Sequence, residues 1–212
     1  MPTLPAITLP PQFLGSTAYY ALIDAAGEVT VDLSLPFDKR FKSIHRCTID
    51  GANGPETLTV PIGKPQSMRS ALWSDIVVSA HGSWWNELLT ALHSAYGRTP
   101  YFEFYIDLFE PLISKDTPGM TITGLDRALD TLLRRLLQID TPVTYNEDAA
   151  KNAFRGSQKD FITMLENSTA AVEYYQVRAL KHGFRPYLSA VDLLFNMGPE
   201  SPFILRQMLP PH

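Results

Sequence analysis

The spacing of apolar residues changes about a third of the way along this chain of 212 residues. In EVTVDLSL (28–35), apolar and polar residues alternate, which is typical of a half-buried strand. After about Ser83 the apolar residues fall three and four apart, the spacing of helices that pack on a core. The change predicts an α+β fold, with a strand-rich first third and a mainly helical remainder.

A β-hairpin is the clearest local prediction in the first third. SIHRCTI (43–49) and ETLTVPI (56–62) flank a polar turn. The turn contains Asn53-Gly54, and these residue types readily adopt the positive φ angles of a tight turn. SDIVVSA (74–80) is predicted to form one more strand.

Several separate helices are predicted in the rest of the chain. Apolar residues at helical spacing extend over 85–96 and over 125–137, and Thr123 is placed to cap the second helix. AVEYYQVRALKHG (171–183) is predicted to be helical, and Ser189 heads the helix after it.

One domain is predicted over residues 1–212, within which a β-rich lobe (1–80) and a helical lobe (81–212) can be distinguished. The polar, weakly periodic stretch 144–160 is predicted to be a long surface loop.

Composition excludes several classes of protein. Eighteen basic against 22 acidic residues give a net charge of −4, which disfavours nucleic-acid binding. The single Cys47 excludes a disulfide framework, and the five histidines lack metal-ligand spacing, so no metal is assigned. No apolar run approaches the roughly 20 residues of a membrane span, and the start lacks the features of a signal peptide. A cytoplasmic protein without a membrane span is expected.

Five stretches of the chain, in order from about Leu9 to Ser201, carry a family resemblance. They are LPPQFLGSTAYYALI, KRFKSIHRCTIDGANGPETLTVPI, HGSWW…SAYGRTPYFEFY, LLQIDTPV and YYQVRALKHGFRPYLSAVDLLFNMGPES. Together they resemble the WbqC-like protein family, and the last stretch is similar to the form found in Bacteroidetes. The resemblance implies a cytoplasmic role in bacterial surface-polysaccharide or O-antigen biosynthesis.

The chain departs from the family pattern at a few positions. His45 stands where the family usually has Asn. In the helix after His81, Trp85 replaces a basic residue, and Leu88 and Leu89 replace a His-Trp pair. Any family activity that needs that histidine is absent from this member.

His81 and Asp32 are the predicted catalytic residues. His81 precedes a predicted helix N-terminus, where a neutral imidazole can act as a base, or where it makes one structural hydrogen bond. Asp32 lies on the polar face of its strand, and a basic cluster that includes Lys39 and Arg46 follows it. Such a cluster either binds a phosphate or carboxylate, or it forms a solvent-exposed strand edge. Lys39 and Arg46 match family positions.

Other candidates have a structural alternative beside the functional one. Trp84 and Tyr96 either stack a sugar or base or pack in the core. Asn196 either faces a pocket or satisfies carbonyls at a helix end. Cys47 is either a buried thiol or a nucleophile that needs a base. His182 is explained as a cation at a helix C-terminus.

Two hypotheses of function follow. In the first, the chain is a transferase that moves a small acyl or aminoacyl group onto an amino sugar. Arg46 and Lys39 would bind an anionic donor or sugar nucleotide, His81 would act as acid/base, and Asp32 would orient one of them. In the alternative, the chain is a non-catalytic ligand-binding or scaffold protein of the same pathway. One pocket shared by Asp32, Arg46, His81 and Asn196 would favour the enzyme. No cofactor is assigned.

Overall fold

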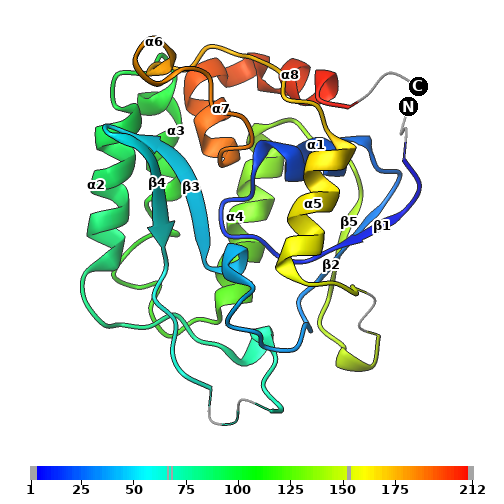
Figure 1. Cartoon of the computed structure of the whole chain (residues 1–212). Helices are drawn as coiled ribbons and strands as arrows, with labels where there is room; N and C mark the ends of the chain where they lie inside the picture. The colour runs from blue at the N-terminus through cyan, green and yellow to red at the C-terminus, as the bar shows by residue number, and fades with distance from the viewer. Residues whose placement is uncertain (1–3, 66, 68, 152–153, 210–212) are drawn as a thin grey trace.

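The computed structural model describes residues 4–65, 67, 69–151 and 154–209, and confirms an α+β fold (Figure 1). The strands are β1 (Ile7–Leu9), β2 (Val29–Asp32), β3 (Arg46–Gly51), β4 (Gly54–Thr59) and β5 (Val143–Asn146). The α-helices are α1 (Thr17–Ala25), α2 (Trp84–Tyr96), α3 (Phe102–Phe109), α4 (Ile122–Leu136), α5 (Gln158–Ser168), α6 (Ala179–His182), α7 (Ala190–Met197) and α8 (Ser201–Gln207). Among these residues, no helix is both long and apolar enough to cross a membrane.

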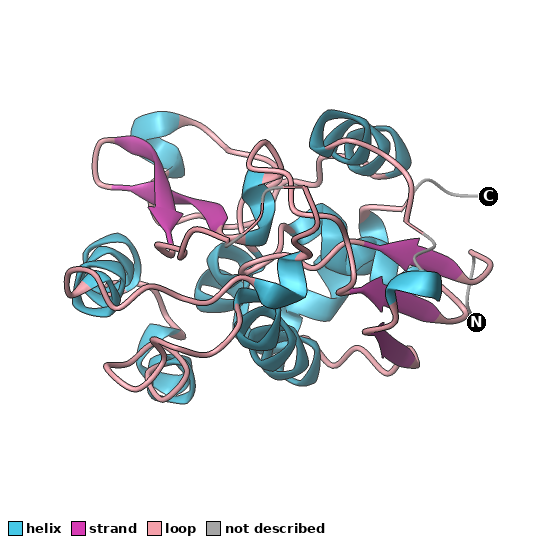
Figure 2. Cartoon of the chain, turned by 90° about the horizontal axis from the view of Figure 1, so that it is seen from below, coloured by secondary structure: helices cyan, strands magenta, loops and turns pink. Residues whose placement is uncertain are grey.

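The strands form two separate sheets. β1, β2 and β5 make a parallel sheet in the order β1-β2-β5, in which Thr30 pairs with both Thr8 and Thr144. β3 and β4 make the antiparallel hairpin, with Thr48 opposite Thr57. The two sheets lie on opposite sides of the molecule, with helices between them (Figure 2).

Helix α7 occupies the centre of the core. Seven consecutive residues, from Ala190 to Asn196, are buried, as expected for a helix that is surrounded by other elements. The hydrophobic cluster around it is continuous and takes in residues from β1, the hairpin and helices α1 to α5. Because α7 touches so many elements, its position sets where several loops lie.

The local predictions with strong sequence patterns are confirmed. The hairpin forms with Gly54 at a φ of 117°. α2 ends at Tyr96, directly before Gly97, and Ser189 caps α7 by accepting a hydrogen bond from the backbone N–H of Val191 at 3.5 Å.

Two predicted elements are wrong. The stretch 74–80 makes only isolated bridges, after a short 3₁₀ turn at Trp73–Asp75. Within 171–183 only the four residues of α6 are helical. The backbone N–H of Val177 donates to the Asn196 side chain, so tertiary hydrogen bonds replace those of a helix there.

The stretch 144–160 is also not a simple loop. It contains most of β5, a 3₁₀ turn and the start of α5, which Ser157 caps. The cap of α4 is Thr121 instead of Thr123, since its hydroxyl accepts from the backbone N–H of Gly124 at 3.1 Å.

Candidate functional site

Asp32 joins two strands of the parallel sheet and is fully buried. Its carboxylate accepts hydrogen bonds from the Ser34 hydroxyl at 2.6 Å, the Asn146 amide at 3.1 Å and the backbone N–H of Phe154 at 3.2 Å. The expectation of a solvent-facing polar strand face is wrong for this residue, because parallel sheets are covered on both faces. These hydrogen bonds connect β2 with β5 and with the segment before α5, which is a structural role.

The other predicted residues of the N-terminal half lie apart from Asp32. His81 is exposed in the loop before α2, and Lys39 is exposed in the loop that follows β2. Trp84 is buried, and its indole N–H donates to the carbonyl of Ser79 at 3.1 Å. α2 and the parallel sheet lie on opposite sides of the molecule, so His81 and Asp32 do not form one site (Figures 1 and 2).

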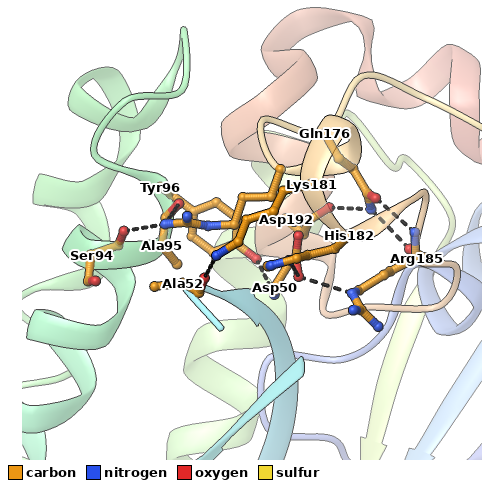
Figure 3. A network of polar contacts seen from close by, with 11 residues as sticks. Asp50, Ala52, Ser94, Ala95, Tyr96, Gln176, Lys181, His182, Arg185 and Asp192 are labelled. Carbon is orange, nitrogen blue, oxygen red and sulfur yellow. Dashed lines mark hydrogen bonds and ion pairs between the residues drawn. The ribbon is translucent and has the colours of Figure 1, made fainter. Parts of the chain in front are cut away.

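Tyr96 and Asn196 belong to a buried polar network around Asp50 and Asp192. Figure 3 shows Tyr96 near Asp50 and Asp192 in this network. The Tyr96 hydroxyl accepts a hydrogen bond from the backbone N–H of Asp50 at 3.2 Å. The Asn196 amide donates to the carbonyl of Asp192 at 2.7 Å and accepts from the backbone N–H of Val177 at 3.0 Å. Both predicted ligand-binding side chains therefore hold the fold together at this point.

Asp192 is the acidic centre of one half of this network. Its carboxylate accepts from the Tyr174 hydroxyl at 2.7 Å and from the Gln176 amide at 2.9 Å. Burial raises the pKa of Asp192 to about 6, although the hydrogen bonds from Tyr174 and Gln176 oppose that shift.

Asp50 is the centre of the other half and is contacted by a histidine and an arginine. Nδ1 of His182 lies 3.2 Å from Oδ1 of Asp50, and Nε of Arg185 lies at the same distance. The Arg185 contact is an ion pair without hydrogen-bond geometry, since its Nε has no hydrogen-bond partner among the described residues. Lys181 donates to the carbonyl of Ala52 at 2.9 Å. His182 therefore pairs with the hairpin as well as ending a short helix.

A cavity of about 380 Å³ lies beside the start of the hairpin, and we call it the Arg46 cavity. Its wall combines the segment before α1, residues of β3 and β4, the start of α5 and the segment before α7. Among the residues predicted to bind a ligand, Arg46 lines this cavity. Asp32, His81 and Asn196 are absent from its described lining, so the four residues do not share this pocket.

The Arg46 cavity is positively charged. Lys42 and Arg46 line it, and none of its described lining residues is acidic. Arg46 is half-buried and has neither an ion pair nor a side-chain hydrogen bond within the described part of the chain. Arg134, which is also half-buried, instead pairs with Asp130 at 2.9 Å. Desolvated charges are normally paired, so this guanidinium is available to pair with an anion.

Two further polar groups of the wall lack partners. Gln12 is 5% exposed, and its Nε2 makes no hydrogen bond among the described residues. The same holds for the hydroxyl of Ser43 and for Nε of Arg46. Buried polar atoms are satisfied in the great majority of cases. All three atoms can donate, so a ligand with acceptor oxygens suits this wall.

Backbone strain also concentrates at the Arg46 cavity. Leu14 and Tyr187, which both line it, adopt φ angles of 44° and 60°, a region that bulky residues rarely occupy. The Ser189 hydroxyl donates to the carbonyl of Leu14 at 2.7 Å, which ties the two strained segments together. Ser16 and Ser189 are the N-caps of α1 and α7, so two positive helix ends border the cavity. Strain of this kind is typical of functional sites.

Cys47 lines the Arg46 cavity but is not an active nucleophile. Burial raises the pKa of its thiol well above the ordinary value, and only the thiolate is reactive. We expect this single cysteine to react with a disulfide reagent at least about 100-fold more slowly in the native protein than in guanidinium chloride. The release of thionitrobenzoate measures both rates, and similar rates would show that the thiol is accessible and ionisable.

Sequence patterns did not identify Gln12, Ser43, Tyr187 and Ser189 as residues of one site. All four fall in stretches that carry the family resemblance, and this is the one signal that points to them. In the described residues, no group of three or more His, Cys, Asp or Glu side chains is placed to hold a metal ion.

The fold and the Arg46 cavity define an α+β protein with a basic pocket, whose described lining holds no acidic residue. The chain belongs to the WbqC-like protein family, whose model matches residues 11–177. The match includes Gln12 and Arg46 and ends before His182 and Asn196. No curated protein matches the chain. No solved structure matches it either.

Proposed function

We propose that this protein binds an anionic small molecule in the Arg46 cavity and acts in bacterial surface-polysaccharide biosynthesis. The unpaired, half-buried guanidinium of Arg46 in an acid-free cavity is the observation that carries the binding role. The family resemblance supports the pathway. A sugar nucleotide or an acyl donor is the proposed class of ligand, and the cytoplasm is the proposed location.

The size and lining of the cavity support a ligand with an oxyanion at one end. A volume of about 380 Å³ is at the lower end of the range for small-molecule sites. Lys42 and Arg46 would face the phosphate or carboxylate, and Thr48 and Thr57, on paired positions of the hairpin, would face hydroxyl or amide groups.

Ligand binding without catalysis is the role that this geometry supports best. Transfer of a small acyl or aminoacyl group onto an amino sugar needs an acid or base at the ligand. The described lining of the cavity holds no histidine and no carboxylate, and the thiol of Cys47 is protonated. The transferase hypothesis is therefore proposed second, on the family resemblance alone.

Substitution of Arg46 tests the binding role. We expect UDP-N-acetylglucosamine, acetyl-coenzyme A or inorganic pyrophosphate to raise the melting temperature of the wild type, because binding to the native state stabilises it. Arg46→Gln should weaken that binding by about 10- to 100-fold, since hydrogen bonds to a charged group contribute about 1.5–3 kcal/mol. Titration calorimetry measures the affinities.

Arg40→Gln is the matched control, because Arg40 is exposed and already paired with Asp38 at 2.8 Å. This variant should bind as the wild type does. Equal affinities of the Arg46→Gln variant and the wild type would contradict the proposal, as would the absence of binding by all three probes. Turnover of acetyl-coenzyme A in the presence of an amino sugar would support the transferase hypothesis.

A further inference from the structure

A second cavity, of about 530 Å³, lies at the C-terminal end of α2 and shares no residue with the Arg46 cavity. Its described lining consists of His93, Ser94, Ala95, Arg98, Val177 and Arg178. Two of these six residues are arginines, one is a histidine and none is acidic. In a chain with a net charge of −4, this concentration of basic groups is a local feature.

One of the two arginines is held in a fixed position. A terminal nitrogen of Arg178 donates to the carbonyls of Ser94 and Ala95, at 2.7 Å and 3.3 Å, and so satisfies the free end of α2. Its Nε is buried and has no hydrogen-bond partner in the described part of the chain. Capping of the helix therefore accounts for the hydrogen bonds of one terminal nitrogen. It does not provide a partner for Nε or an anion to balance the positive charge.

The other basic groups are not needed by the helix end. Arg98 has no ion pair or side-chain hydrogen bond with any residue that the structure describes. The His93 ring packs edge-on against Phe102, with ring centroids 4.8 Å apart, so its orientation is set. Both residues lie on the last turn of α2 or just after it and face the same cavity as Arg178.

We propose that this second cavity binds a phosphoryl group. Two guanidinium groups and an imidazole offer several donors and more than one positive charge, which matches a dianionic phosphate better than a monovalent carboxylate. The site is separate from the Arg46 cavity and does not depend on the function proposed for it. It would bind inorganic phosphate or the phosphoryl group of a ligand other than the one in the Arg46 cavity.

Titration of the ¹⁵N-labelled protein with inorganic phosphate, followed by amide NMR, tests this site. We expect saturable shifts in residues 93–98 and 177–178 in the wild type and in Arg46→Gln. Sodium acetate at the same ionic strength should bind at least about fivefold more weakly. Arg98→Gln should weaken phosphate binding at this site by about fivefold or more.

Arg135→Gln is the control, because Arg135 is also exposed and has no partner among the described residues. It should leave the phosphate titration unchanged. His93→Gln is a second variant at the cavity itself, and it should weaken phosphate binding less than Arg98→Gln does. Equal affinities of Arg98→Gln and Arg135→Gln would overturn the proposal, as would equal binding of acetate. Phosphate shifts confined to residues around Arg46 would also overturn it while leaving the first proposed function intact.

Discussion

Replacing Phe195 by alanine is expected to lower the free energy of unfolding by about 3–5 kcal/mol. Phe195 is fully buried on α7. Its ring lies 5.4 Å from that of Tyr96, 5.0 Å from Phe102 and 5.9 Å from Phe109, measured between centroids. The truncation leaves a cavity where α2, α3 and α7 meet, and it removes three aromatic contacts at once. Urea unfolding measures the change.

Phe104→Ala is the matched control, since it removes the same ring from α3 at a position that is 74% exposed. Its effect should stay within about 0.5 kcal/mol, as is usual for surface changes. Similar losses for Phe195→Ala and Phe104→Ala would show that α7 is not the centre of the core.

The importance of α7 extends beyond packing. Its N-cap Ser189 borders the Arg46 cavity, and its Asp192 and Asn196 anchor residues 174–177. A shift of α7 would therefore disturb the cavity wall and the polar network together. For this reason we expect ligand affinity at Arg46 to be sensitive to core substitutions that preserve every lining residue.

Elements with strong local patterns were predictable from the sequence. The hairpin followed from alternation around Gly54, α2 from apolar spacing that ends at Gly97, and the start of α7 from Ser189. Each of these patterns is contained within a few residues, so no knowledge of distant partners is needed to interpret it.

The parallel sheet was not predictable in this way. β5 has four residues and pairs with β2. Thr144 of β5 lies opposite Thr30 of β2, which is 114 positions away in the chain. Short strands with polar residues carry little periodic signal, and parallel pairing is set by tertiary contacts. The burial of Asp32 has the same cause. Its hydrogen-bond partners include Asn146 on β5 and the backbone of Phe154 before α5, and both are far from Asp32 in the sequence.

The candidate site was predictable only in part. Arg46 was identified because it stands in a basic cluster and matches a family position, and the structure places it in a cavity. Tyr187 and Gln12 were missed, since their importance comes from a strained backbone and an unpartnered amide, which are visible only in three dimensions. His81 lies in an exposed loop outside the described lining of the Arg46 cavity, so a catalytic role for it stays a prediction.

The pH dependence of stability should reveal Asp192. Its pKa is about 6 in the folded protein against an ordinary value of 3.8, chiefly because the carboxyl is buried. A raised carboxyl pKa means that the native state holds the proton more tightly than the unfolded chain does. This contribution to stability is fully present below about pH 4 and is lost as pH rises through about 6. About two pKa units correspond to roughly 3 kcal/mol.

Asp192→Asn removes the titrating group, so the difference in unfolding free energy between wild type and variant should change by roughly 2–2.5 kcal/mol between pH 4 and pH 7. Urea unfolding at half-unit steps of pH measures this difference, in which the contributions of acids that do not interact with Asp192 cancel. The exposed Asp107 provides the control, because Asp107→Asn should give a nearly flat difference over the same range. A flat difference for Asp192→Asn would mean that the Asp192 carboxylate ionises as easily inside the network as in water.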